Sequence, residues 1–372
     1  MKKARVLPII LASAISTFVG CGGKQKLTSI FRDAPKITRP DYVRLEKLYD
    51  IDVTHINMFN KGNDFVSFID FDEQGNMYIA DSHQGKIFVY DDRGALLRSF
   101  GARGQGPTDF DGISRILVDR DVLRVFESGA DVKNVTLHGE FISKILVSIE
   151  NRLSVNKVGP NYFVLRAKLD NTFTKMDLIV SLYNKDLSLV RDLFVYSYPP
   201  GFRGPSYDFR FSDWILIRGN GEFYFPEDNL NKYSIIHYRN DAKPMKAFGR
   251  KYTPVGYSRE AENRYNELYG RMLEKREFPR NPPVVNRMFQ DERGNIWILV
   301  GETYEDNRNP EFENTVDIFD SRGEWVYSMK TKSISKYCLY HQGRIYKAQP
   351  PDDGSLSQNL EVYEIKYSDK VN

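Results

Sequence analysis

The chain has 372 residues, of which 41% are hydrophobic and 13% aromatic, enough for a sizeable core and too apolar for a disordered chain. Its 53 basic and 50 acidic side chains differ only through Lys2, Lys3 and Arg5, so the chain is neutral from residue 21 on. A nucleic-acid binder usually carries a basic excess, and a spanning helix needs about 18 consecutive apolar residues. No such run follows residue 20, so both classes are disfavoured.

The first twenty residues have the pattern of a secretory signal. A basic start precedes an apolar stretch, Val6 to Val19, which is short for a transmembrane helix and leads into Gly20-Cys21. This end resembles the lipobox of bacterial lipoproteins, in which the Cys becomes the first mature residue and carries the lipid. The resemblance implies a signal peptide at 1–20, lipidation of Cys21 and a tether at 21–40. Gly22, in place of Asp, implies the outer membrane, facing the periplasm. An ordinary signal peptide with a chance cysteine is the alternative.

Cys338 is the only other cysteine, so no intramolecular disulfide is expected once Cys21 carries a lipid. The segment Tyr337-Cys338-Leu339-Tyr340 is predicted to be a strand, with Cys338 as a small buried hydrophobe. His341 lies three residues further on, which puts it on the opposite face of a strand, so a Cys–His nucleophile pair is rejected.

Internal repetition is the main signal of the sequence. Residues 68–80 read as a strand, a Gly-Asn turn and a second strand, and residues 86–100 repeat the pattern around Asp-Arg-Gly. Two such hairpins make a four-stranded antiparallel unit. Six units recur between residues 65 and 367, with first or second turns at Arg120-Asp121, His138-Gly139, Gly159-Pro160, Lys185-Asp186, Gly219-Asn220, Asn240-Asp241, Arg293-Gly294, Arg322-Gly323 and Gln342-Gly343.

This rhythm predicts an all-β fold, a six-bladed β-propeller over residues 41–372, because a single sheet cannot bury both of its faces. The alternating strand at Tyr42–Leu48 is expected to complete the last blade and close the ring. A chain of two β-sandwich domains is the structural alternative, although sandwich strands would not keep the two-hairpin rhythm.

Asn76 to Ser82, Ile87 to Asp91 and Arg98 to Gly101 together are similar to an NHL-type propeller repeat. The following segment, Phe100 to Phe110, resembles the linker of six-bladed propeller lipoproteins of unknown function in diderm bacteria. The similarity is good over residues 65–115, partial over 285–325 and only a hydrophobic rhythm elsewhere. It implies the fold and no established reaction.

Strand alternation sends the connections of a propeller to two faces. The first-to-second and third-to-fourth turns, which share one face, are short throughout. The connections on the other face are long: 101–112, 192–213, 249–283, 301–314 and 349–359. Long loops on a rigid scaffold commonly carry binding residues. The loop at 249–283 is predicted to contain a helix near 258–278, which either covers the axial mouth or packs on the rim.

Two sets of loop residues are candidates for binding. Asp81 and His83, in a second-to-third loop, are expected to share a face with Arg103 and Gln105 of the following interblade link. The glycines of that link are expected to permit tight backbone contacts between blades. Tyr198, Arg203 and Tyr207 lie in an aromatic loop suited to stacking on a sugar or peptide, or to forming the loop's own small core.

No metal or catalytic motif appears: the five histidines lack ligand spacing, and no cofactor is required, although axial calcium stays open. The leading hypothesis is therefore a lipid-anchored, non-catalytic envelope propeller. Its long-loop face would bind a protein partner or a carbohydrate or peptide ligand, and not nucleic acid. The alternatives are a metal-dependent lactonase-like hydrolase or lyase and a structural subunit of an envelope complex.

Overall fold

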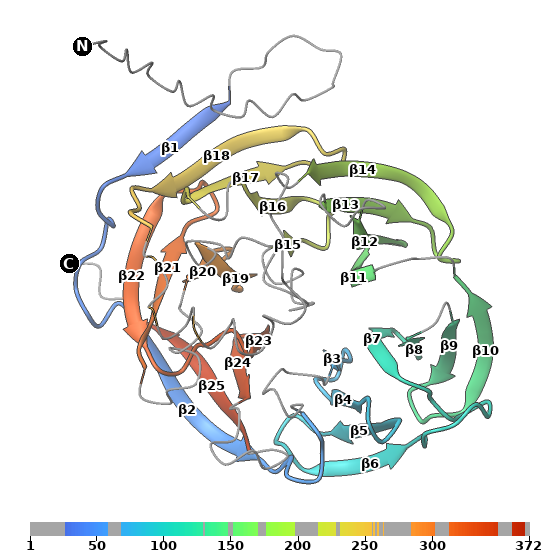
Figure 1. Ribbon diagram of the computed structural model, residues 1–372. Coiled ribbons are helices and arrows are strands. Elements are labelled where there is room, and N and C mark those ends of the chain that lie inside the picture. The colour runs from blue at the N-terminus through green and yellow to red at the C-terminus, as the bar shows by residue number, and fades with distance from the viewer. Residues whose placement is uncertain are drawn as a thin grey trace, which may run out of the picture.

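The computed structural model describes residues 27–58, 68–128, 131–147, 152–169, 176–197, 215–227, 231–254, 284–301, 312–348 and 359–368, together with residues 256, 259 and 263. In this part of the chain, twenty-five strands form six sheets around a central axis (Figure 1). The predicted six-bladed propeller is confirmed. No helix among these residues is long and apolar enough to cross a membrane.

The blades are numbered along the chain, and in each blade the strands follow one another from the axis to the rim. Blade 1 contains β3 (Phe68–Phe71), β4 (Met77–Asp81), β5 (Lys86–Tyr90) and β6 (Leu96–Phe100). Blade 2 contains β7 (Ile113–Asp119), β8 (Val122–Glu127), β9 (Asp131–Thr136) and β10 (Phe141–Leu146). Blade 3 contains β11 (Arg152–Val158), β12 (Asn161–Leu169), β13 (Met176–Tyr183) and β14 (Leu189–Ser197).

The second half of the ring has the same plan. Blade 4 contains β15 (Leu216–Ile217), β16 (Phe223–Pro226), β17 (Ser234–Tyr238) and β18 (Pro244–Arg250), with β1 (Thr28–Arg32) added at its edge. Blade 5 contains β19 (Val285–Gln290), β20 (Ile296–Val300), β21 (Asn314–Phe319) and β22 (Trp325–Thr331). Blade 6 contains β23 (Cys338–His341), β24 (Arg344–Ala348), β25 (Leu360–Tyr367) and β2 (Val43–Ile51).

The short turns are locked by a repeated Asp-x-x-Gly-Asn sequence, seen at Asp72 in blade 1 and at Asp291 in blade 5. The Asp72 carboxylate accepts hydrogen bonds from the backbone N–H of Gln74 (3.0 Å) and of Asn76 (2.8 Å). Gly75 takes a φ of 85°, which glycine adopts without strain. In blade 5 the second oxygen of Asp291 also accepts the indole N–H of Trp297 at 2.8 Å, so the turn is tied to the core.

Strand β2 closes the ring as predicted. It pairs antiparallel with β25, from Val43 opposite Tyr367 to Ile51 opposite Leu360. The first strand of the propeller thus becomes the outermost strand of the last blade. Because blade 6 is built from both ends of the fold, the ring opens only if this pairing is lost.

The segment expected to be a tether contains a strand that the sequence did not predict. β1 pairs in parallel with the outer edge of β18, from Thr28 opposite Lys246 to Arg32 opposite Arg250. The chain then crosses blade 5, where the N–H groups of Lys36 and Ile37 bond to the carbonyls of Trp325 and Val326 at 3.0 and 2.9 Å. We call residues 28–51 the N-terminal strap, since they follow the rim of blades 4, 5 and 6 in Figure 1.

The expected loop at 192–213 begins later than predicted, because β14 continues to Ser197. Phe194 packs edge-on against Phe225 with ring centroids 5.1 Å apart, and Tyr196 lies 5.1 Å from the same ring. These two aromatic residues therefore belong to the packing between blades 3 and 4. Of the helix predicted near 258–278, Arg259 and Asn263 are helical and the rest lies outside the described residues.

The core lies between neighbouring blades, where the faces of successive sheets pack on each other. Its largest fully buried side chain is Trp297, and the Cys338 thiol is also buried, with 1% of the residue exposed. Cys338 begins β23, as expected, and its sulfur accepts the N–H of Ser335 at 3.2 Å. Burial raises the pKa of this thiol and keeps it protonated.

Candidate functional site

On the long-loop face of blade 1, Asp81 is a buried anchor. It ends β4 with none of its surface exposed. One carboxylate oxygen accepts the backbone N–H groups of His83 (2.8 Å) and Gln84 (2.9 Å). The other accepts the N–H (2.8 Å) and side-chain amide (2.9 Å) of Asn57 and the amide of Gln84 (2.8 Å). Its five hydrogen bonds fix the loop at 82–85 to the segment that follows β2.

A buried lysine holds the neighbouring interblade link, 101–112, in place. The Lys133 ammonium, on β9, donates to the carbonyls of Gly106 (3.1 Å) and Asp109 (2.5 Å). Its charge is balanced by Glu127, 3.4 Å away, whose carboxylate also accepts the N–H of Asp111. Both Lys133 and Glu127 are buried. The backbone of the link is therefore held by a buried ion pair and not by apolar packing alone.

The loop at 82–85 and the link approach each other closely at glycines. A Cβ on Gly85 would lie 2.7 Å from the backbone of Arg103, and one on Gly101 would lie 2.6 Å from the Phe110 ring. Gly101 also takes a φ of 84°. Side chains at these positions would push the loop and the link apart.

The candidate residues of this face therefore divide into an anchor and three exposed groups. The structure brings the loop of His83 next to the link that carries Arg103 and Gln105, and all three residues are exposed. The Arg103 guanidinium stands 4.0 Å from Asp111 in a pair that leaves 70% of the arginine side chain exposed. The binding roles assigned to these residues and to Asp81 stay predictions. Tyr198, Arg203, Tyr207 and Cys21 lie outside the described residues.

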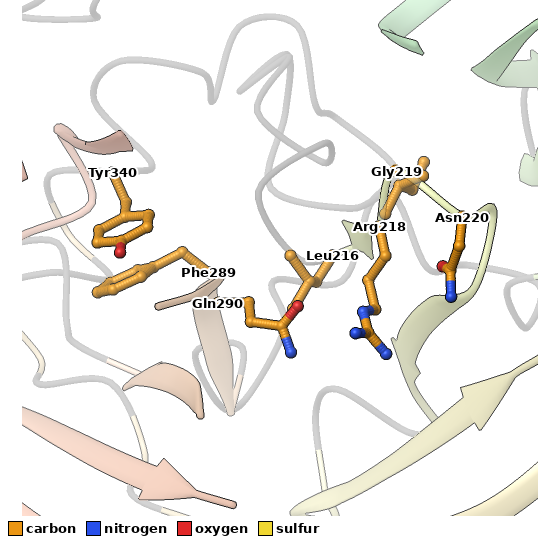
Figure 2. Close-up of a pocket in the computed structure, with 8 residues that line it drawn as sticks. Leu216, Arg218, Gly219, Asn220, Phe289, Gln290 and Tyr340 are labelled. Carbon is orange, nitrogen blue, oxygen red and sulfur yellow. The ribbon is translucent and has the colours of Figure 1, made fainter. Parts of the chain in front are cut away.

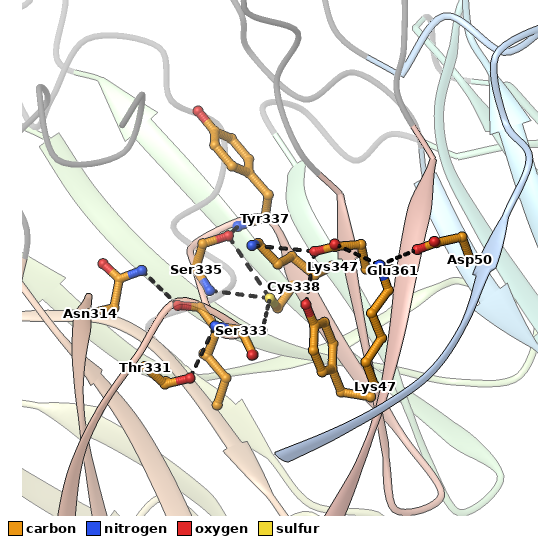
Figure 3. Close-up of polar contacts among 12 residues, drawn as sticks. Lys47, Asp50, Asn314, Thr331, Ser333, Ser335, Tyr337, Cys338, Lys347 and Glu361 are labelled. Carbon is orange, nitrogen blue, oxygen red and sulfur yellow. Dashed lines mark hydrogen bonds and ion pairs between the residues drawn. The ribbon is translucent and has the colours of Figure 1, made fainter. Parts of the chain in front are cut away.

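Further along the same face, ion pairs and hydrogen bonds connect the strands of blade 6 and the link that precedes it. Figure 3 shows Glu361, at the start of β25, between Lys47 (3.0 Å) and Lys347 (3.4 Å). Burial favours the neutral form of Glu361, but its hydrogen bond with Lys47 and the charge of Lys347 outweigh that effect and lower its pKa. Beside this network, the amide of Asn314 donates to the carbonyl of Ile334 at 2.7 Å and holds the link between blades 5 and 6.

The opposite, short-turn face has a pocket of about 470 Å³. It is lined by the inner strands of blades 4, 5 and 6 and the β15–β16 turn: Leu216, Ile217, Arg218, Gly219, Asn220, Phe289, Gln290 and Tyr340. Figure 2 shows the stacked rings of Phe289 and Tyr340 on one side and Arg218 and Asn220 on the other. Phe289 is held between Tyr340 (centroids 4.9 Å apart) and Trp297 (5.3 Å).

The charge of Arg218 is partly neutralised inside this pocket. Its guanidinium lies 2.7 Å from Glu222, which also lies 3.3 Å from the imidazole of His237. Burial favours the neutral acid, but contacts of Glu222 with Asn220, His237 and Arg218 outweigh it and lower its pKa. The pocket thus offers ring edges, amides and a paired cation. The sequence did not predict this pocket, because it forms only where inner strands from three distant repeats meet. The aromatic residues just before the short turns, such as Phe289 and Tyr340, were the sequence feature that could have indicated it.

Among the residues that the structure describes, no group of three or more His, Cys, Asp or Glu side chains is placed to hold a metal ion.

Comparisons with known proteins identify the fold class, a six-bladed propeller, and no more. No protein family matches the sequence, and no curated protein does. The structure of an exported protein from Bacteroides fragilis aligns with a TM-score of 0.57 and 12% identity, covering 92% of this chain and all of the other. A member of the DUF4221 family from Bacteroides vulgatus aligns with a TM-score of 0.50 and 14% identity, covering 89% and 100%.

Proposed function

We propose that the protein is a lipid-anchored envelope propeller that binds a ligand or protein partner through its long-loop face, without catalysis. The main support is topological. The described strands alternate in direction, so the second-to-third and interblade connections of the ring, which include those predicted to be long, begin and end on one face, whereas the opposite face has tight turns such as Asp72–Asn76. Long connections on one face of a rigid scaffold commonly carry binding residues.

The local support is the anchoring of this face in blades 1 and 2. The Asp81 and Lys133 contacts use buried groups to fix the backbone, and this leaves His83, Arg103 and Gln105 exposed on a preorganised frame. Preorganisation lowers the entropy cost of binding. These three side chains offer a cation, an imidazole and an amide, which suits an acidic or polyhydroxylated ligand.

The envelope location rests on the signal and lipobox pattern that ends at Cys21, and it agrees with the fold shared with an exported Bacteroides fragilis protein. Mass spectrometry of the purified N-terminus tests the anchor. An acylated Cys21 as the first residue is expected, and an unmodified chain would contradict it.

Photo-crosslinking in intact cells tests the recognition face. A photoreactive amino acid is placed at His83, Arg103 or Gln105, and, as the matched control, at Arg93 in the β5–β6 turn of the same blade. We expect one species to be captured from all three long-loop positions and not from Arg93. Capture from Arg93 alone would move the binding site to the short-turn face. A partner held in constant ratio from both faces would favour the structural-subunit alternative.

A further inference from the structure

The outer edge of blade 4 is strongly basic, in contrast to the rest of the molecule. The two segments that meet there, residues 27–36 and 239–251, contain seven basic side chains and two acidic ones, whereas the chain from residue 21 on is balanced overall. β1 and β18 bring these segments together by parallel pairing. The charges are thus gathered on one side of the ring by the unexpected strand.

Several of these cations face solvent. The side chains of Lys243 and Lys251 are 69% and 86% exposed, and that of Arg239 is 50% exposed. Arg250 is less exposed, because it pairs with buried Asp317 at 2.6 Å. The exposed cations also have acidic neighbours, since Arg239 and Lys243 share Asp241, and Lys251 lies 3.5 Å from Asp33. Arg32 and Lys36 share Glu324, so four carboxylates stand against the seven cations and the edge keeps a positive excess.

Two large apolar side chains stand among the charges. Phe31 on β1 is 51% exposed and Met245 on β18 is 45% exposed. Apolar groups surrounded by lysine and arginine are the combination that peripheral proteins present to anionic lipid surfaces.

The short stretch of chain before β1 brings this edge to the bilayer. Only six residues separate Cys21 from Thr28, where β1 begins and the chain becomes fixed to the ring. At full extension this distance is at most about 25 Å. A lipid on Cys21 would therefore hold the blade 4 edge, and not an arbitrary part of the propeller, close to the membrane surface. A tether reaching to residue 40 would impose no such limit.

We infer that the blade 4 edge, formed by β1 and β18 with the β17–β18 turn, docks against an anionic bilayer surface and sets the propeller edge-on to the membrane. This inference rests on the proposed lipid anchor and extends it. Thr28 lies opposite Lys246, toward the short-turn end of β18, and the edge-on orientation leaves the long-loop face uncovered by lipid. The face proposed for recognition is then open to a partner in the surrounding compartment.

Energy transfer to a headgroup acceptor tests this orientation. The lipidated protein is placed in phosphatidylethanolamine vesicles with 30% phosphatidylglycerol and labelled at Asn240→Cys or at Arg93→Cys. Both positions are exposed and lie in third-to-fourth turns, but in blades 4 and 1, on opposite sides of the ring. Cys338 is buried and does not compete for label. We expect clearly stronger transfer from position 240; equal transfer, or stronger transfer from position 93, overturns the inference.

Charge reversal tests the docking surface itself. Each lysine near an anionic surface contributes about a fivefold change in binding. Charge reversal by Lys243→Glu with Lys251→Glu, neutral phosphatidylcholine vesicles, or 0.5 M salt should each reduce the difference between the two labels to the part that the short tether alone maintains. Lys185→Glu with Arg191→Glu, exposed on blade 3, is the matched control and should preserve it. A difference that is unchanged by charge reversal and by neutral lipid overturns docking by the basic edge. Absence of acyl groups on Cys21 instead refutes the anchor, and leaves the crosslinking test of the recognition face unaffected.

Discussion

Replacing Asp81 by alanine should destabilise the propeller strongly. The change removes the acceptor of five hydrogen bonds, three of them from the backbone N–H groups of Asn57, His83 and Gln84. A buried donor left without a partner costs about 1–3 kcal/mol. Water entering the small cavity restores part of this, so we expect a loss of about 3–5 kcal/mol in the free energy of unfolding.

Thermal unfolding followed by circular dichroism measures this effect. For a protein of this size the expected decrease in melting temperature is on the order of 4–6 °C. Asp92→Ala is the matched control, because Asp92 is an exposed acid in the same blade, and its effect should stay within about 0.5 kcal/mol. Asp81→Asn keeps one acceptor oxygen but turns an amide N–H toward donors, so it should remain clearly destabilised. If Asp81→Ala melts with the Asp92→Ala control, the anchoring role is refuted.

Three further perturbations test other parts of the structure. Arg250→Met leaves the buried carboxylate of Asp317 without its cation and should lower the free energy of unfolding by about 3–5 kcal/mol, measured by chemical denaturation. The double variant that adds Asp317→Asn should recover part of this loss. Equal stability of the single variant and wild type would contradict a buried ion pair. Tyr42→Ala removes the edge-on ring contacts with Tyr327 (5.4 Å between centroids) and Tyr367 (5.7 Å). The N-terminal strap should then become cleavable by protease under native conditions. Unchanged protection would mean that the strap does not depend on these contacts. Burial lowers the pKa of His341, so its contribution to stability is present above the unfolded pKa of about 6.5 and is lost as the pH falls below it. His341→Phe keeps the ring stacked on Phe71 and should reduce the fall in melting temperature between about pH 6.5 and 5. The same fall in wild type and variant would refute this role of His341.

The ring itself follows from local sequence. Turn residues such as Gly75 and Gly294 stand where a positive φ is required, and the alternating strand at Tyr42–Leu48 had no partner near it in sequence. The turns and the strand alternation are local signals, so the blades were predictable. The pairing of the closing strand with β25 is long-range, and it was predictable because a closed ring leaves its last blade in need of a fourth strand.

The parts that were missed depend on contacts between distant segments. β1 has little apolar character of its own and exists because β18 offers an open edge more than 200 residues away. The end of β14 was taken as loop because Phe194 and Tyr196 reveal their packing partner, Phe225, only when blades 3 and 4 meet. Asp81 shows the same limit at the candidate site: its position on the face was predictable, but its complete burial was not.

Binding of the crosslinked species to two sets of variants tests the central proposal most directly. One set changes the exposed groups of the long-loop face, His83→Ala, Arg103→Ala and Gln105→Ala together. The other changes the pocket on the short-turn face, Arg218→Ala with Asn220→Ala. We expect the dissociation constant to rise at least about tenfold, roughly 1.4 kcal/mol, in the first set and to stay unchanged in the second, with both melting temperatures retained. The reverse result would contradict recognition by the long-loop face.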